Sequence, residues 1–191
     1  RDLRMSRGLG DVYKRQTSVG SGEPLLLLHG NTASSVMFAD VVRYYTGSFE
    51  VYLIDFLGHG LSERVERFAT DLWYDEAMQV IAFLEQANIG KVNIIGSSGG
   101  ALVAINVALE RPDLVRAVIA DSFEGEKPLE AFVKNVVQER EVSKQDPSTV
   151  AVYQFNHGAD WETVVDNDTC AMDEHYKSIG KFFHKPCLLY T

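Results

Sequence analysis

Short apolar runs alternate with longer segments of helical length over residues 24–121, and this alternation restricts the chain to one kind of fold. The runs that read as buried strands are LLLLH, VYLID, VNIIG and VRAVIAD, at 25–29, 51–55, 92–96 and 115–121. Strands separated by helices pair most simply as parallel neighbours, because each helix returns the chain to the start of the sheet. The sequence therefore predicts an α/β fold with a mostly parallel sheet flanked by helices.

Helices are expected between these strands. The first follows capping residues 31–35 and gathers its apolar side chains on one face, namely Met37, Val41, Tyr44 and Tyr45. The second is amphipathic, with apolar residues at helical spacing from Tyr74 to Leu84, and runs to a stop at 88–90. The third covers about 99–110 and ends there because the residue before Pro112 avoids the α region.

The pattern changes after Asp121, where Pro128 suits the first turn of an amphipathic helix. The apolar stripe of that helix is Leu129, Phe132, Val133, Val136 and Val137. Further helices are expected around 147–156, 160–166 and 169–182, and no strand between 122 and 184. A helical insertion after a strand of a parallel sheet predicts a cap over the carboxyl edge, where such sheets bind ligands. We therefore divide the chain into a core at 17–121 and a helical cap at 122–184.

The stretch GSSGG at 96–100 lies where the third predicted strand becomes a helix. Such a tight turn holds its central residue in a strained conformation and leaves that side chain exposed. Residues two positions away must be small, and Gly96 and Gly100 meet this requirement around Ser98. The Gly99 amide and the positive end of the helix would stabilise an oxyanion beside the Ser98 hydroxyl. These residues predict a nucleophilic serine, with an idle serine in a glycine-rich turn as the alternative.

Three segments resemble the α/β-hydrolase family, and the resemblance spans nearly all of 17–184. They are GSGEPLLLLHGNTAS at 20–34, DFLGHGLS at 55–62 and IIGSSGGALVAINVALERPDLV at 94–115. The resemblance implies that Ser98 is the nucleophile and that the amides of Asn31 and Gly99 form the oxyanion hole. The predicted strand ends agree, since both amides belong to loops at the carboxyl ends of neighbouring strands.

A serine hydroxyl needs a base to take its proton and an acid to orient that base. In this family the acid and then the histidine follow the serine along the chain, after the cap. We therefore expect both beyond residue 191 and the catalytic site to be incomplete in this chain. The substitutes within the chain are Asp121, at a strand end, as acid and His157, in the cap, as base. The competing interpretations are an ordinary strand-end carboxylate and a histidine that packs the cap.

The resemblance implies a serine hydrolase that cleaves a small ester or a related acyl bond through an acyl-enzyme on Ser98, inactive as this chain. Carbon–carbon bond hydrolases, peroxidase-type enzymes and aminopeptidases share these motifs. A protein that binds a ligand in the same fold without turnover is the alternative from another class. No metal or organic cofactor is implied, and the expected partner is a small-molecule substrate.

Charge and cysteine content exclude some partners. The net charge of −9, with no clustered Lys/Arg face, argues against nucleic acid. No apolar run approaches the roughly 18 residues of a membrane span. Cys170 and Cys187 lack metal-ligand spacing and are expected to be free thiols in the cytoplasm. The sequence does not indicate an oligomeric state.

Both ends of the chain differ from its middle. Residues 1–16 are rich in basic side chains, and RGLGDVYKRQ at 7–16 resembles translated sequencing-adapter sequence. We interpret 1–16 as a non-native extension, with a basic amphipathic extension as the alternative. The segment 185–191 is either the start of a strand that follows the cap or a non-native tail.

Overall fold

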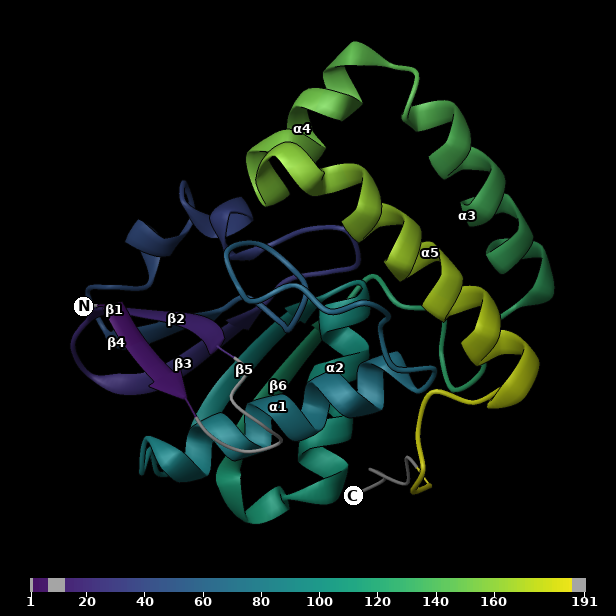
Figure 1. Cartoon of the computed structure of the whole chain (residues 1–191). Coiled ribbons are helices and arrows are strands. Elements are labelled where there is room, and N and C mark those ends of the chain that lie inside the picture. The colour runs from purple at the N-terminus through teal and green to yellow at the C-terminus, as the bar shows by residue number, and fades with distance from the viewer. Residues whose placement is uncertain (1, 7–12, 187–191) are drawn as a thin grey trace.

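The computed structural model describes residues 2–6 and 13–186, and its centre is a sheet (Figure 1). Among the described residues the sheet has six strands in the order β1-β2-β4-β3-β5-β6. The strands are β1 Asp2–Ser6, β2 Tyr13–Gly20, β3 Glu23–Leu28, β4 Phe49–Ile54, β5 Val92–Ser97 and β6 Val115–Asp121. The β4–β3–β5–β6 part is parallel, whereas β2 pairs antiparallel with both β1 and β4. The predicted mostly parallel sheet with flanking helices is confirmed.

The helices fall into two groups (Figure 1). Two follow strands of the sheet: α1 Leu72–Gln86 and α2 Gly99–Glu110. Three follow β6 and lie together beyond the sheet: α3 Glu130–Ser143, α4 Pro147–His157 and α5 Trp161–Ser178. We call α3–α5 the helical segment. Short 3-10 turns are η1 Ser35–Phe38, η2 Val42–Tyr44, η3 Pro112–Leu114 and η4 Gly158–Asp160.

The four consecutive leucines of β3 are buried because both faces of the sheet are covered. Leu26 and Leu28 pack into the main core with α1 and α2, and Leu25 and Leu27 pack on the opposite face with Phe38. Successive side chains of a strand point to opposite faces, so a strand buried on both sides reads as a continuous apolar run. This packing places the carboxyl end of β3 at the centre of the sheet.

The helix expected over residues 37–45 does not form. The chain makes η1 and η2 instead, and Phe38 is the buried apolar residue of this stretch, whereas Met37, Val41 and Tyr44 are 44%, 40% and 73% exposed. In a 3-10 turn, side chains three apart are eclipsed, so the four-residue spacing from Met37 to Val41 does not define one buried face. The predicted apolar face was therefore wrong.

The helical segment differs from its prediction in detail. The helices expected at 160–166 and 169–182 are one continuous helix, α5, which ends at Ser178. On α3 only Val133 of the predicted stripe is fully buried, while Leu129 and Phe132 are 60% and 41% exposed. No strand lies between 122 and 184, as predicted, and these residues are all described. The division of the chain at 121/122 into core and cap stays a prediction.

Two strands at the start of the chain were not predicted. β2 is polar, with Gln16 and Ser18 buried, so it lacks the apolar alternation that marks a strand. It is fixed instead by its antiparallel pairing with β4, from Gln16–Ile54 to Gly20–Glu50. The strand runs across the boundary proposed at residue 16, and the non-native origin of 1–16 stays a prediction. The interpretation of 185–191 stays a prediction, because 187–191 lie outside the described residues.

No helix in residues 2–6 and 13–186 has the length and hydropathy required to cross a bilayer. Cys170 is an exposed free thiol, and the cytoplasmic location stays a prediction.

Packing at the β5–α2 turn predicts a large stability difference between two glycine substitutions. A Cβ at Gly100 would lie 2.3 Å from the Leu28 carbonyl oxygen, whereas a Cβ at Gly90 meets nothing within 4 Å. We expect Gly100→Ala to lower the free energy of unfolding by about 1–3 kcal/mol or more. Gly90→Ala is the matched control and should change it by less than about 0.5 kcal/mol. Urea unfolding measures both, and equal effects would contradict the packing described.

Candidate active site

Ser98 lies on the turn between β5 and α2, and its backbone is strained. Its φ of 55° and ψ of −121° belong to a region that residues with side chains rarely adopt. The Ser98 amide donates to the Asp121 carbonyl at 2.8 Å, and the Ser98 carbonyl accepts from the Ala101 amide at 2.9 Å. The Ser98 side chain is exposed. The turn therefore presents a serine hydroxyl at the carboxyl edge of the sheet.

The glycines of the turn are closely packed, and Gly96 and Gly100 meet backbone atoms that cannot move aside. A Cβ at Gly96 would lie 2.0 Å from the Gly100 carbonyl oxygen, so strand and helix touch through backbone atoms. A Cβ at Gly99 would lie 2.2 Å from Oδ1 of Asn31. The sequence predicted the need for Gly96 and Gly100. It did not predict the close contact at Gly99, which arises from a side chain on another loop.

The loop after β3 brings Asn31 to the Ser98 turn. A Cβ on Gly30 would lie 3.1 Å from Cβ of Ser98, so this loop and the turn are in contact. The backbone N–H of Asn31 makes no hydrogen bond to any described residue. Gly99 is the first residue of α2, and the first four amides of a helix lack an acceptor within the helix. Two amides beside Ser98 are therefore free to bind an oxygen atom.

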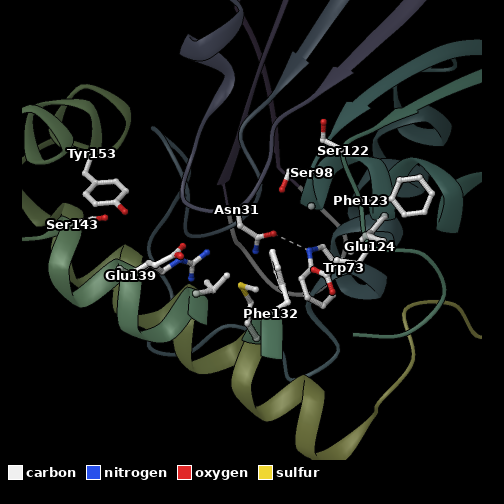
Figure 2. A pocket seen from close by; sticks show the side chains of 15 residues that line it. Asn31, Trp73, Ser98, Ser122, Phe123, Glu124, Phe132, Glu139, Ser143 and Tyr153 are labelled. Atoms are coloured by element: carbon white, nitrogen blue, oxygen red, sulfur yellow. Dashed lines mark hydrogen bonds between the residues drawn. The ribbon is translucent and has the colours of Figure 1, made fainter. Parts of the chain in front are cut away.

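A cavity of about 340 Å³ opens at Ser98 (Figure 2). Its lining comes from the Ser98 turn, the loop after β3, α1, the loop after β6 and the helical segment. The lining residues are Asn31, Trp73, Ser98, Gly99, Leu102, Ser122, Phe123, Glu124, Phe132, Val136, Glu139, Arg140, Ser143, Tyr153 and Met172. The lining mixes apolar and polar side chains, and its volume fits a small molecule.

The Asn31 side chain is held from both ends. Its Oδ1 accepts from Nε1 of Trp73 at 3.1 Å, the bond drawn in Figure 2, and its Nδ2 donates to Oδ2 of Asp168 at 2.8 Å. Trp73 lies on α1 and Asp168 on α5, so this side chain joins the core to the helical segment. Its polar atoms are thus occupied by the protein, which leaves the backbone amide for a ligand.

Asp168 is fully buried and has several polar neighbours. Its Oδ1 lies 2.6 Å from Nη1 of Arg140 on α3, and its Oδ2 lies 3.5 Å from Nε2 of His59. Burial alone would raise the pKa of Asp168, but Arg140, His59 and Asn31 together bring that pKa below its ordinary value. Asp168 is therefore an ionised carboxylate inside the protein.

Glu76, on the far side of His59, has a pKa shifted in the opposite direction. Its Oε1 lies 4.0 Å from Nδ1 of the same ring. Burial, with the charges of Asp168 and Asp75 nearby, raises the pKa of Glu76 well above its ordinary value. The pKa values of the two carboxyl groups beside His59, those of Asp168 and Glu76, are therefore shifted in opposite directions.

His157 is buried, and the backbone occupies both of its ring nitrogens. Nδ1 accepts from the Gly60 amide at 3.0 Å, so Nε2 carries the proton and donates to the Thr32 carbonyl at 2.9 Å. Burial lowers the pKa of His157 to about 4, and the hydrogen bond to the Thr32 carbonyl opposes this effect only in part. His157 does not line the cavity at Ser98. The structure does not bring this candidate base to the serine.

Asp121 touches the turn through its backbone. Its carbonyl accepts from the Ser98 amide, while its exposed carboxylate accepts from the Ser122 hydroxyl at 2.9 Å. Asp121 is also absent from the described cavity lining, and so is every histidine of residues 13–186. The structure brings together Ser98, Asn31, Gly96, Gly99 and Gly100, but not Asp121 or His157 as proton-transfer groups.

No cluster of three or more His, Cys, Asp or Glu side chains that could hold a metal ion is found among residues 2–6 and 13–186. The residues that sequence analysis missed are Trp73, Arg140 and Asp168. Trp73 lies 42 positions and Asp168 137 positions from their common partner Asn31. No spacing rule joins residues so far apart, because only the docking of α5 brings them together.

Comparison with known proteins agrees with the fold that carries this site. A family model described as alpha/beta hydrolase fold matches residues 23–151. Haloalkane dehalogenase 2 of Mycobacterium tuberculosis (strain ATCC 25618 / H37Rv) is 35% identical over 101 residues, which are 52% of this chain and 35% of that protein. The (E)-2-((N-methylformamido)methylene)succinate hydrolase of Acinetobacter baylyi is 32% identical over 129 residues, 66% of this chain and 47% of that protein. These matches cover about a third to a half of the relatives' length.

Among solved structures, a hydrolase from Pseudomonas aeruginosa PA01 superimposes with a TM-score of 0.70. It covers 93% of this chain and 74% of that one at 13% sequence identity. At this identity the likeness concerns the fold alone.

The buried state of His157 predicts how stability depends on pH. Its pKa is about 4 in the folded protein and about 6.5 in an unfolded chain, so between these values the unfolded state binds the extra proton. Stability is therefore lost as the pH falls from about 6.5 to 4. We expect His157→Gln to reduce the slope of the free energy of unfolding against pH by up to about 1.4 kcal/mol per pH unit. Urea unfolding at a series of pH values measures it, and an unchanged slope would contradict the assignment.

Proposed function

The chain belongs to the alpha/beta hydrolase family, and from that premise we propose that it is a serine hydrolase that cleaves a small ester or a related acyl bond. The observation that carries the proposal is Ser98, exposed on a strained strand-to-helix turn at a cavity of about 340 Å³. Two free amides lie beside it. This is the arrangement that acyl transfer to a serine requires.

In the proposed mechanism Ser98 Oγ attacks the carbonyl carbon of the substrate, and the carbonyl oxygen gains the negative charge. The Asn31 and Gly99 amides donate hydrogen bonds to that oxygen, and the positive end of α2 adds to their effect. Collapse of the tetrahedral species expels the leaving group and leaves an ester on Ser98. Water then hydrolyses this ester and regenerates the hydroxyl.

The nucleophile favours acyl bonds over carbon–halogen bonds. A serine that displaced a halide would form an ether, which water does not cleave under mild conditions. A serine that attacks a carbonyl forms an ester, which water does cleave. The likeness to a haloalkane dehalogenase therefore supports the fold and a hydrolytic role, while Ser98 supports acyl hydrolysis in this chain.

Proton transfer needs a group that the described cavity lining does not contain. No histidine of residues 13–186 lines the cavity, and His157 binds two backbone groups. We propose that Asp121 and His157 are structural and that the acid and base of this mechanism come from outside the described residues. This chain should then hydrolyse its substrate slowly.

We also propose that the helical segment acts as a cap on the site. It contributes cavity-lining residues from α3, α4 and α5, among them Phe132, Tyr153 and Met172. These side chains would select the substrate. Mixed apolar and polar lining suits a small molecule that carries both kinds of group.

A non-catalytic protein that binds a small ligand in this cavity is the second candidate. The observation that favours it is the lack of an imidazole in the described lining. Such a protein would bind ligands at the cavity but would not form a covalent bond to Ser98.

Labelling by a fluorophosphonate, with imidazole added as an external base, separates the two candidates. We expect covalent labelling of Ser98, accelerated by about tenfold or more when imidazole is present, because the added base takes the serine proton. Ser98→Ala should abolish it. Ser97→Ala is the matched control, since Ser97 is the neighbouring residue at the end of β5, and it should label normally.

Mass spectrometry of the labelled protein reads the outcome. Labelling at Ser98 that imidazole does not accelerate would contradict the proposal that the described residues supply no base to Ser98. No labelling at Ser98 under either condition would contradict the proposed function and favour the binding protein.

A further inference from the structure

We infer that Asp168 is a positioning residue, which sets the geometry of the oxyanion hole through Asn31. The inference rests on the proposed function. Asp168 belongs to α5 in the helical segment, while Asn31 belongs to the loop after β3. The two residues meet directly, as Nδ2 of Asn31 lies 2.8 Å from Oδ2 of Asp168.

The loop at 30–33 has a conformation that needs outside support. Thr32 has a φ of 56°, in the left-handed region that favours glycine, so this backbone is strained. The Thr32 amide lies 3.4 Å from the same Asp168 oxygen that binds Asn31. One carboxylate oxygen therefore holds two successive residues of the loop.

Further support for this loop also comes from the helical segment. His157 donates to the Thr32 carbonyl, and Oδ1 of Asn156 accepts from the Ser34 hydroxyl at 2.9 Å. The loop that carries the Asn31 amide is thus fastened to α4 and α5 at several successive points. A shift of these helices would move the amide relative to Ser98.

The charge of Asp168 matters as well as its shape. A buried carboxylate is retained only with good partners, and the Arg140 guanidinium at 2.6 Å provides one. The second oxygen is left for Asn31. An asparagine at 168 would offer a single acceptor oxygen, so Arg140 and Asn31 would compete for it.

The test is a double-mutant cycle on phosphonylation of Ser98 in the presence of imidazole. The variants are Asn31→Ala, Asp168→Asn and the two combined, with Asp166→Asn as a control on the exposed face of the same helix. The inactivation rate constant (kinact) and the inhibitor concentration at half that rate (KI) are measured separately. Urea unfolding of each variant reports folding.

We expect Asp168→Asn to lower kinact by about tenfold or more with little change in KI, because the misplaced amide affects the transition state. In the Asn31→Ala background the same substitution should change kinact less than about threefold, since Asp168 acts through Asn31. Asp166→Asn should match the wild type.

Other outcomes overturn the inference. Wild-type kinact in Asp168→Asn, or a full loss from Asp168→Asn in the Asn31→Ala background, would show that Asp168 does not act through Asn31. If Asp168→Asn does not fold, Arg140→Met with Asp168→Leu removes both charges together and leaves none unpaired. A wild-type kinact in this double variant would also overturn the inference. Absence of wild-type labelling at Ser98 would instead contradict the proposed function itself.

Discussion

The close approach of β3, β5 and the start of α2 is the constraint on which the rest of the site depends. A Cβ at Gly96 would meet the Gly100 carbonyl at 2.0 Å, and one at Gly100 would meet the Leu28 carbonyl at 2.3 Å. Only glycine fits at both positions, and Ser98 between them must adopt a positive φ. That conformation exposes the hydroxyl and places it beside the first amide of α2. The proposed chemistry follows from backbone packing.

Charged and polar side chains of the helical segment position the loop that carries the Asn31 amide. Asp168 is buried and charged, and it is retained there because its Oδ1 forms an ion pair with Arg140 and its Oδ2 accepts a hydrogen bond from Asn31. The position of α5 therefore affects the orientation of the loop that contains the Asn31 amide. His157 binds the same loop through the Thr32 carbonyl. This contact explains why a histidine is buried here without requiring it to transfer a proton.

The family resemblance implied the Asn31 and Gly99 amides, whereas short-range patterns in the sequence predicted the parallel sheet and the strained turn at Ser98. These features depend on residues that are adjacent or separated by one strand and one helix. The polar strand β2 escaped prediction because its stability comes from pairing with β4 and not from an apolar face. The role of Asp168 escaped because its contacts span 137 positions to Asn31. Long-range polar contacts leave no periodic signal in a single sequence.

The central claim is that an oxygen atom bound to the group on Ser98 lies between the Asn31 and Gly99 amides. The most direct measurement is a crystal structure of the protein after reaction with a fluorophosphonate. The account predicts phosphorus bonded to Oγ of Ser98, with the phosphoryl oxygen about 2.7–3.1 Å from both amide nitrogens. Phosphorus on another residue, or a phosphoryl oxygen directed away from these amides, would contradict it.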